Sequence, residues 1–478
     1  MIALSLGEIA SLVGGRLVDA DPSVAVTGTV EYDSRKVGPG ALFIALPGEH
    51  VDGHDYVATA VAQGAVAALV SRVVSAPRIE VADGVGAITA LASAVARRLP
   101  AMIIGITGSS GKTSTKDLLA QLLTSVGPTI APAGSMNNEL GHPYTVLRAD
   151  EHTQFLVLEM GARGIGQVRH LAEIAPPRIG VVLNVGSAHL GEFGSREAIA
   201  QAKGELVEAL PCAADGGVAV LNADDPLVSA MAARTRARVV TVGQAASADV
   251  RAHDVRLDDL GRPGFTLQVG AEAAPVQLRQ VGAHNVANAL SAAAVALEAG
   301  LSVAATAAAL TTATSTSRWR MELSERPDGV LIINDAYNAN PESMRAALAA
   351  LATLARTHRE SGRRTVAVLG PMAELGSAAE AEHAAIGRLT ASLDISRLLA
   401  VGEAARPMHD SAALEGSWDG ESAWVPDVDA AIAALRATLR PGDVVLVKAS
   451  RAASLERVAL AIAEDGPRPL EPTGGDGA

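Results

Sequence analysis

The sequence predicts an α/β protein of three domains, in which mainly parallel sheets are covered by helices. Short apolar runs of strand length alternate with amphipathic helical segments, this alternation restarts sharply twice, and 478 residues exceed the size of one ordinary domain. We expect a small N-terminal α/β domain at 1–98, a central parallel sheet at 99–315 and a C-terminal Rossmann-like α/β domain at 316–466. The Gly/Pro-rich tail at 467–478 is expected to be disordered.

In the N-terminal segment, short strand-like runs and helical runs follow one another. The segments 24–37 and 41–46 are predicted to be strands, and 56–71 a helix followed by a strand. An amphipathic helix at 84–99 is expected to close the domain.

The same rhythm returns in the other two domains. The central domain is expected to contain strands at 101–108, 154–160, 179–186 and 217–223, and to end with helices at 283–300 and 303–313. The C-terminal domain is expected to contain strands at 329–336, 365–370, 397–402 and 443–449, with helices at 342–355 and 430–439. Alternation of this kind is typical of parallel sheets with helices on both faces.

The composition argues against several classes of protein. Apolar residues make up 49% of the chain and charged residues 19%, which rules out a disordered chain. The net charge of −13 argues against a general binder of nucleic acid or anionic membranes, whose signature is a basic surface. No apolar run is long enough to span a membrane, and the N-terminus is expected to form a helix and not a signal peptide. The single cysteine, Cys212, cannot form an internal disulfide, which fits a cytoplasmic protein.

A phosphate-binding loop is predicted at the end of the first central strand, from Thr107 to Thr113 (TGSSGKT). Glycines let backbone N–H groups turn inward around a phosphate, and the N-terminus of the following helix adds positive potential. Lys112 would neutralise the β- and γ-phosphates, and the Thr113 hydroxyl would ligate Mg²⁺. The common form of this loop has a glycine where Ile106 stands, so a chance Gly-rich turn is the alternative. The sequence therefore predicts a mononucleotide-binding P-loop domain.

Other polar positions have an ordinary structural interpretation beside a functional one. Glu159 ends a predicted strand and is placed to reach a metal beside the phosphate loop, although many strands end in glutamate. His189 would by default be a structural or exposed histidine, and Lys203 a solvated helix lysine. The turn 335–341 (DAYNANP) is either a binding turn or a plain helix cap.

Eleven separated motifs occur in the order that one known family has. They are DSRKVGPGALFIALPGEHVDGHDY, ITGSSGKTSTK, NNELGHPYTVL, LEMGARGIGQV, NVGSAHLGEFGS, AKGEL, NADDP, GAHNVANALSAAA, INDAYNANPESM, VLGPMAELG and VKASRAASLE. On these motifs the chain resembles the Mur ligases, the ATP-dependent amide-forming enzymes of peptidoglycan assembly, over essentially all three domains. The YNANP turn is similar to that of the branch that adds a dipeptide, and the DYAHTPD-like turn of the branch that adds the third residue is missing.

The resemblance implies a reaction. ATP would be used to join D-alanyl-D-alanine to UDP-N-acetylmuramoyl-tripeptide through an acyl phosphate, giving the pentapeptide precursor, ADP and phosphate. Both partners are small molecules, no nucleic acid is expected, and the chain is expected to be a monomer. Another Mur-type amino-acid ligase is an alternative. From the phosphate loop alone, so are a P-loop kinase or nucleoside triphosphatase and a non-catalytic nucleotide-regulated module.

The resemblance also implies roles for individual residues. ATP would be bound by Thr107, Gly108, Ser109, Ser110, Gly111, Lys112, Thr113, Ser114, Asn285, Asn288, Arg318 and Asp335. The N-terminal domain would bind the UDP-sugar through Ser34 and Arg35, and a substrate-facing loop of the central domain would contribute Asn137, Asn138 and Glu139. The C-terminal domain would bind the dipeptide and close on ATP, and its substrate-binding residues would be Tyr337, Asn338, Asn340, Lys448, Ser450 and Arg451. Mg²⁺ would be ligated by Thr113, Glu159, His189 and Lys203, the last as a carbamate formed with CO₂. Catalysis would depend on Lys112, Lys203, His189 and Arg318.

Two positions depart from the family pattern. Ser317 precedes Arg318 where the family usually has glycine, and Ala449 stands where the family commonly has glycine.

Overall fold

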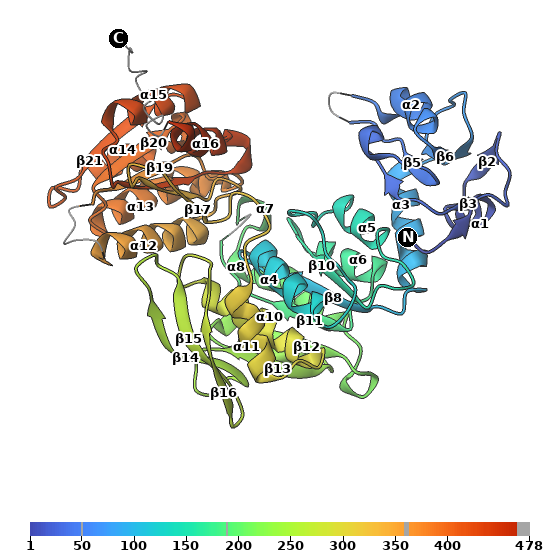
Figure 1. Cartoon of the computed structure of the whole chain (residues 1–478), viewed down its shortest axis with the longest axis horizontal. Helices are drawn as coiled ribbons and strands as arrows, with labels where there is room; N and C mark the ends of the chain where they lie inside the picture. Colours follow the sequence, from blue (N-terminus) through green and yellow to red (C-terminus); the bar gives the residue numbers. More distant parts are fainter. Residues whose placement is uncertain (49–50, 188–189, 358–362, 466–478) are drawn as a thin grey trace, which may run out of the picture.

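The computed structural model describes residues 1–48, 51–187, 190–357 and 363–465. Three α/β bodies follow one another along the chain, coloured blue, cyan to yellow, and orange to red in Figure 1. This confirms the predicted three-domain α/β class. Within the described residues, no helix is long and apolar enough to cross a membrane.

The N-terminal domain is built on a five-stranded sheet in the order β2-β7-β6-β5-β4. Its strands and helices are β1 (Leu4–Ser5), α1 (Leu6–Leu12), β2 (Arg16–Val18), β3 (Ala25–Val26), β4 (Val30–Glu31), β5 (Ala41–Ile44), α2 (Val57–Ala62), β6 (Ala65–Val70), β7 (Arg78–Glu80) and α3 (Gly84–Ala96). The strand predicted at 24–37 is in fact two short strands and a 3₁₀ turn. The break falls at Gly28, which is packed so closely that a Cβ there would lie 2.6 Å from the Pro39 carbonyl oxygen.

The central sheet has nine strands, in the order β16-β15-β14-β13-β12-β11-β8-β10-β9. They are β8 (Met102–Thr107), β9 (Thr129–Ile130), β10 (Phe155–Glu159), β11 (Ile179–Val182), β12 (Val218–Asn222), β13 (Arg238–Gly243), β14 (Val250–Leu257), β15 (Pro263–Val269) and β16 (Glu272–Gln277). Its helices are α4 (Lys112–Thr124), α5 (Gly141–Val146), α6 (Gln167–Ile174), α7 (Leu190–Phe193), α8 (Arg196–Glu208), α9 (Pro226–Ser229), α10 (Asn285–Glu298) and α11 (Val303–Thr312).

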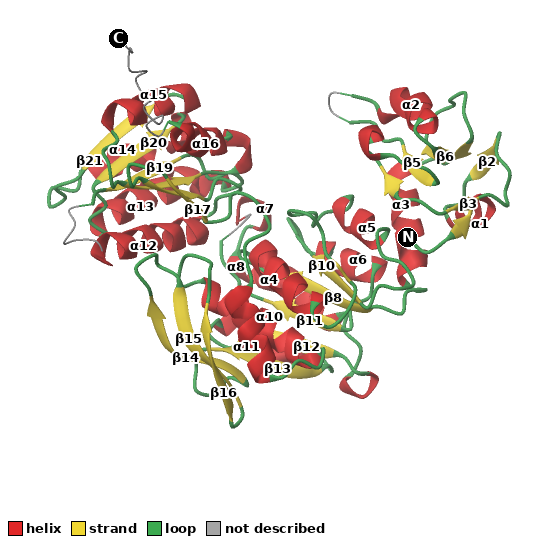
Figure 2. Ribbon diagram, in the orientation of Figure 1, coloured by secondary structure: helices red, strands yellow, loops and turns green. Residues whose placement is uncertain are grey.

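The two faces of this sheet bury different helices, as expected for a parallel α/β sheet (Figure 2). Along β10, Phe155 and Val157 pack with α4, α10 and α11, whereas Leu156 and Leu158 pack with α3, α6 and α8. Successive residues of β10 are thus buried on opposite faces of the sheet. Because both faces are covered, the strand is a continuous apolar run in the sequence.

Five strands of the central sheet, β9 and β13 to β16, have no counterpart in the sequence prediction. The last three pair antiparallel and extend the sheet as a meander. Their side chains alternate between buried and partly exposed, as in Phe265 and Leu267 on β15. This period of two was the signal that could have predicted them.

The C-terminal sheet has six strands in the order β17-β18-β22-β19-β20-β21, all parallel except the edge strand β17. They are β17 (Glu322–Glu325), β18 (Leu331–Asn334), β19 (Thr365–Leu369), β20 (Arg397–Val401), β21 (Glu421–Val425) and β22 (Val444–Lys448). The helices are α12 (Pro341–Thr357), α13 (Ala379–Ser392), α14 (Arg406–Ala413), α15 (Val428–Thr438) and α16 (Glu456–Glu464). Helices alternate with the parallel strands along this domain, which makes it a Rossmann-like α/β layer, as predicted.

The carboxyl ends of β8, β10 and β11 meet at one edge of the central sheet, because β8 lies between the other two and all three run parallel. Loops that follow these strands therefore converge. The residues after β8 and β10 include the predicted phosphate loop and Glu159.

His142 on α5 is fully buried under this edge, with Nδ1 3.5 Å from the carbonyl oxygen of Glu159. Burial lowers the pKa of His142 from 6.5 to about 4. As the pH falls below 6.5, His142 is protonated in the unfolded chain but still neutral in the folded protein. The free energy of unfolding should therefore decrease between pH 6.5 and pH 4, and this histidine should cause no further decrease below pH 4. The difference between the two pKa values is worth about 3 kcal/mol.

Urea denaturation of the central domain between pH 4 and 7.5 should measure this slope. His142→Met should flatten it, and the exposed His152→Met should leave it unchanged. An identical slope in wild type and His142→Met would contradict the assignment.

Candidate functional site

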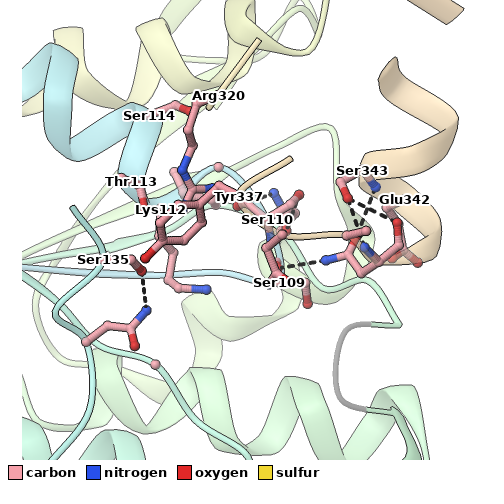
Figure 3. Close-up of a pocket in the computed structure, with 18 of the residues that line it drawn as sticks. Ser109, Ser110, Lys112, Thr113, Ser114, Ser135, Arg320, Tyr337, Glu342 and Ser343 are labelled. Carbon is pink, nitrogen blue, oxygen red and sulfur yellow. Dashed lines mark hydrogen bonds between the residues drawn. The ribbon is translucent and has the colours of Figure 1, made fainter. Parts of the chain in front are cut away.

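A cavity of about 1130 Å³ opens where the central and C-terminal domains meet. It is lined by the phosphate loop and the start of α4, the loops after β9 and β10, α8, the start of α10, the domain linker, the turn after β18, and the loops after β19 and β22. Figure 3 shows lining residues of both domains converging on the cavity, among them Lys112 and Thr113 of the central domain and Tyr337 and Glu342 of the C-terminal domain. A cavity of this size between two domains can enclose a nucleotide and a second ligand.

The phosphate loop joins β8 to α4 as predicted, and its shape depends on one glycine. Gly111 caps α4 at φ +81°, and a Cβ there would lie 2.3 Å from Oδ1 of Asn288. The chain after β11 supports the loop: the Ser110 N–H donates to Asn184 Oδ1 (3.0 Å), and the Gly186 N–H donates to Ser109 Oγ (2.9 Å). Asn184 therefore shapes the loop, and this role is not among those predicted from the sequence.

Lys112 is the first residue of α4 and its amine donates to the Gly108 carbonyl oxygen at 2.8 Å. Burial lowers the pKa of Lys112; Glu159 raises this pKa and Arg320 lowers it. Two cations thus approach one another at the mouth of the loop. An anion between them would relieve this repulsion, which is what a phosphate offers.

Glu159 lies directly beneath the cavity lining and is completely buried. Its Oε2 accepts from the hydroxyls of Ser135 (3.1 Å) and Thr113 (3.3 Å) and from Asn137 Nδ2 (3.4 Å). Its Oε1 is buried and accepts no hydrogen bond from any residue that the structure describes. A buried carboxylate oxygen that lacks a donor suits a cation. Thr113 and Glu159 therefore fit two of the predicted Mg²⁺ ligands.

Lys203 on α8 lines the cavity and is 3% exposed. Across the described part of the chain its amine makes no hydrogen bond or ion pair. Burial lowers the pKa of Lys203 well below its usual value, and the charge of Lys112 lowers it further. A lower pKa favours the neutral, nucleophilic form of the amine. It is not the solvated helix lysine of the ordinary interpretation.

No group of three or more His, Cys, Asp or Glu side chains gathers around a point in the ranges that the structure describes. His189, the fourth predicted metal ligand, lies outside those ranges. Among the described residues, the metal ligands that the site offers are therefore Thr113 and Glu159, and Lys203 faces the same cavity.

The C-terminal domain brings a second set of polar groups to the cavity. The Lys448 amine donates to Asp335 Oδ2 (2.6 Å) and to the Asn338 carbonyl oxygen (2.9 Å), which ties β22 to the turn after β18. Asn340 Nδ2 donates to the Ser109 carbonyl oxygen at 3.3 Å, and so touches the phosphate loop directly. The DAYNANP turn is thus part of the cavity and does more than cap α12.

An arginine does reach the phosphate loop, but it is Arg320 and not Arg318. Arg318 is exposed and lies outside the cavity lining. Arg320 Nη2 donates to Thr113 Oγ1 at 2.9 Å, and its guanidinium stacks on the Tyr337 ring at 4.2 Å. Its Nε is buried without a partner among the described residues. Two arginines stand two residues apart in one turn, and the backbone there decides which one faces inward.

Most other predicted residues also line the cavity. They are Ser114, Asn137, Asn138, Glu139, Asn285, Asn288, Ser450 and Arg451. Thr107 and Gly108 belong to the loop but lie behind its lining surface. Ser34 and Arg35 lie in the N-terminal domain, where Arg35 pairs with Asp33 at 2.8 Å, and they take no part in this cavity.

These contacts predict different outcomes for the two arginines. Arg320→Ala should weaken ATP binding by about 10-fold or more, because a charge-assisted contact to phosphate is lost. Arg318→Ala should change the Kd less than twofold. Isothermal titration with ATP and Mg²⁺ measures both, and a larger loss at Arg318 than at Arg320 would overturn the placement.

Comparison with known proteins agrees with this arrangement domain by domain. The chain matches the family models described as "Mur ligase family, catalytic domain" at 28–101, "Mur ligase middle domain" at 106–296 and "Mur ligase, glutamate ligase domain" at 319–451.

Relatives cover almost the whole chain. It is 54% identical to the UDP-N-acetylmuramoyl-tripeptide–D-alanyl-D-alanine ligase of Mycobacterium tuberculosis (strain H37Rv), over 97% of this chain and 98% of that one. A crystal structure of MurF from Acinetobacter baumannii superposes with a TM-score of 0.84 at 30% identity, covering 97% of this chain and 99% of the other. MurF from Thermotoga maritima in complex with ADP gives 0.77 at 29% identity, covering 92% and 98%. The chain therefore belongs to the Mur ligase family.

Proposed function

We propose that the chain is an ATP-dependent, ADP-forming peptide ligase that joins D-alanyl-D-alanine to UDP-N-acetylmuramoyl-tripeptide. One observation carries the proposal: a single cavity holds both the phosphate loop of the central domain and the polar turn of the C-terminal domain. A reaction in which ATP activates one substrate for attack by another needs these two sites in contact. The names of the relatives and the ADP bound to the Thermotoga maritima protein support the same assignment.

The first step is electrostatically difficult, because the substrate carboxylate must approach a triphosphate. Attack of the carboxylate oxygen on the γ-phosphorus forms an acyl phosphate and releases ADP. Lys112 and Arg320 converge where the phosphates would lie and would offset the repulsion between the two anions. The N-terminus of α4 adds positive potential at the same point.

In the second step the dipeptide amine attacks the acyl carbon, and phosphate leaves. The polar turn at Asp335–Asn340, fixed by Lys448, would orient the dipeptide, because it touches the phosphate loop through Asn340. Enclosure between two domains would also keep water away from the acyl phosphate. A simple kinase or triphosphatase would leave this turn and the buried Lys203 without a role.

Thr113 and Glu159 would hold Mg²⁺, which fits the unpaired Oε1 of Glu159. When bound, the ion would neutralise phosphate charge. Reaction of Lys203 with CO₂ would turn a buried amine into an anionic carbamate and add oxygen donors beside Glu159. The depressed pKa of Lys203 favours this, because only the neutral amine reacts.

We also propose a division of labour among the domains. Residues 1–98 would bind the UDP-sugar through Ser34 and Arg35, 99–315 would bind ATP, and 316–466 would bind the dipeptide and close on ATP. The N-terminal domain contacts the central domain through the Tyr144 hydroxyl, which donates to Glu31 Oε2 at 2.7 Å.

The deciding experiment is phosphate release from ATP with Mg²⁺, UDP-N-acetylmuramoyl-tripeptide and D-alanyl-D-alanine, each omitted in turn. We expect release only with all components, together with a pentapeptide product in the mass spectrum. Release without the dipeptide would indicate a triphosphatase. Activity only with a single amino acid would move the chain to another branch of the family.

Lys203→Ala should lower kcat by about 100-fold or more, because the site loses its extra oxygen ligands. Short carboxylic acids added to the assay should restore part of the rate, whereas Lys203→Arg should stay inactive without rescue. Carbon-13 NMR with labelled bicarbonate should show a carbamate signal in wild type only. Normal turnover of Lys203→Ala would refute the carbamate.

A further inference from the structure

The linker between the central and C-terminal domains is fastened to α4, the helix that begins at the phosphate loop. The Ser317 N–H donates to Asp117 Oδ2 (2.9 Å), and the Ser317 hydroxyl donates to Asp117 Oδ1 (3.1 Å). One turn further along α4, Gln121 exchanges two hydrogen bonds with the backbone of Thr314, at 2.7 and 3.0 Å. The linker is thus tied to the central domain up to Ser317.

Asp117 is 4% exposed and forms an ion pair with its neighbour Lys116, Nζ to Oδ1 at 2.6 Å. The Lys116 amine also donates to the carbonyl oxygens of Pro132 (2.7 Å) and Gly134 (3.2 Å). The next residue, Ser135, donates to Glu159. A buried ion pair is a poor way to gain stability, but it fixes geometry when its hydrogen bonds are made. The proposed reaction gives neither Lys116 nor Asp117 a direct part.

Immediately after Ser317, the chain is held by the C-terminal domain instead. The Tyr337 N–H donates to the Trp319 carbonyl oxygen (3.2 Å), and the Met321 N–H donates to Asp335 Oδ1 (3.1 Å). The Arg451 guanidinium stacks on the Trp319 ring at 4.5 Å. Only Arg318 lies between the two sets of anchors. It is exposed and, within the described ranges, makes no hydrogen bond or ion pair.

The backbone around Arg320 is also held in an unusual conformation. Trp319 (φ +59°) and Met321 (φ +52°) both adopt the left-handed region, although neither is glycine. This conformation persists because the residues on each side are anchored. It directs Arg320 towards Thr113, as Figure 3 shows.

We infer that Asp117 is a positioning residue for the ligase reaction: by holding Ser317 on α4 it fixes the central end of a joint at Arg318, and so delivers Arg320 to the phosphate loop. The inference rests on the proposed function. The two arginines of the linker then have different roles. Arg318 is the joint between the domains, and Arg320 faces the phosphate loop. A purely structural Asp117 would affect folding without acting through Arg320.

A double-mutant cycle distinguishes these roles. We would measure kcat and KM for ATP in wild type, Asp117→Asn, Ser317→Ala and Arg320→Ala, and in Asp117→Asn combined with Arg320→Ala, with thermal melts of each. Asp117→Asn should lower kcat about 10-fold or more in the wild-type background, because misplaced catalytic groups cost rates of that order. In the Arg320→Ala background the same change should lower kcat less than twofold.

A matched control is Asp443→Asn in the C-terminal domain. Asp443 is 2% exposed and pairs with Arg364 at 2.7 Å, far from the linker in sequence and confined to one domain. It should lower the Tm as Asp117→Asn does and leave kcat unchanged. If Asp117→Asn does not fold, Ser317→Ala, combined with Arg320→Ala in the same way, carries the test, with an expected loss of several-fold.

Independent losses that multiply in the double mutant would overturn the inference. So would wild-type kcat in folded Asp117→Asn and Ser317→Ala, or an equal loss in Asp443→Asn. Absence of ligase activity in wild type would instead overturn the proposed function.

Discussion

The gathering of basic side chains beside the phosphate loop is the constraint on which the rest of the site depends. Lys112, Lys203 and Arg320 face one part of the cavity, and burial lowers the pKa of both lysines. Glu159 lies beneath them and is shielded from solvent. Such an arrangement is unfavourable without bound anions, so the fold must hold these groups together at some cost in stability. A bound triphosphate would supply the missing negative charge, and a cation would give Glu159 the partner that it lacks among the described residues.

The basic side chains come from separate rigid elements of the fold. Lys112 starts α4 directly after β8, the strand that lies between β10 and β11. Lys203 lies on α8, which packs on the opposite face of the sheet from α4. Arg320 arrives from another domain and rests on Tyr337.

The parts of the site that could be predicted from sequence are the local ones. The phosphate loop is contiguous, so the pattern TGSSGKT after an apolar run was enough to place it. Glu159 was placed by the same logic, because strand ends in a parallel sheet share one edge. Lys203 needed the resemblance to a known family, since nothing in its own helix shows that the amine is buried.

The parts that could not be predicted depend on contacts distant in sequence. Arg318 and Arg320 are equivalent in the sequence, and only the left-handed turn at Trp319 and Met321 selects the second. Asn184 supports the loop from the segment that follows the neighbouring strand β11, 74 residues from Ser110. Asp117 meets Ser317 across 200 residues. Polar residues of this kind carry no local pattern that would distinguish them from surface residues.

The separation of the N-terminal domain from the cavity has a consequence for substrate choice. The cavity is formed by the central and C-terminal domains alone, within the residues described, and Ser34 and Arg35 stand apart from it. If the uridine end is held there, the peptide of the substrate must bridge the distance to Lys112. Its carboxylate then reaches the phosphate only when the peptide has the right length. Binding energy from the remote nucleotide would then serve to position the reacting carboxylate. In this arrangement the distance between the domains would select substrates by peptide length before ATP is consumed.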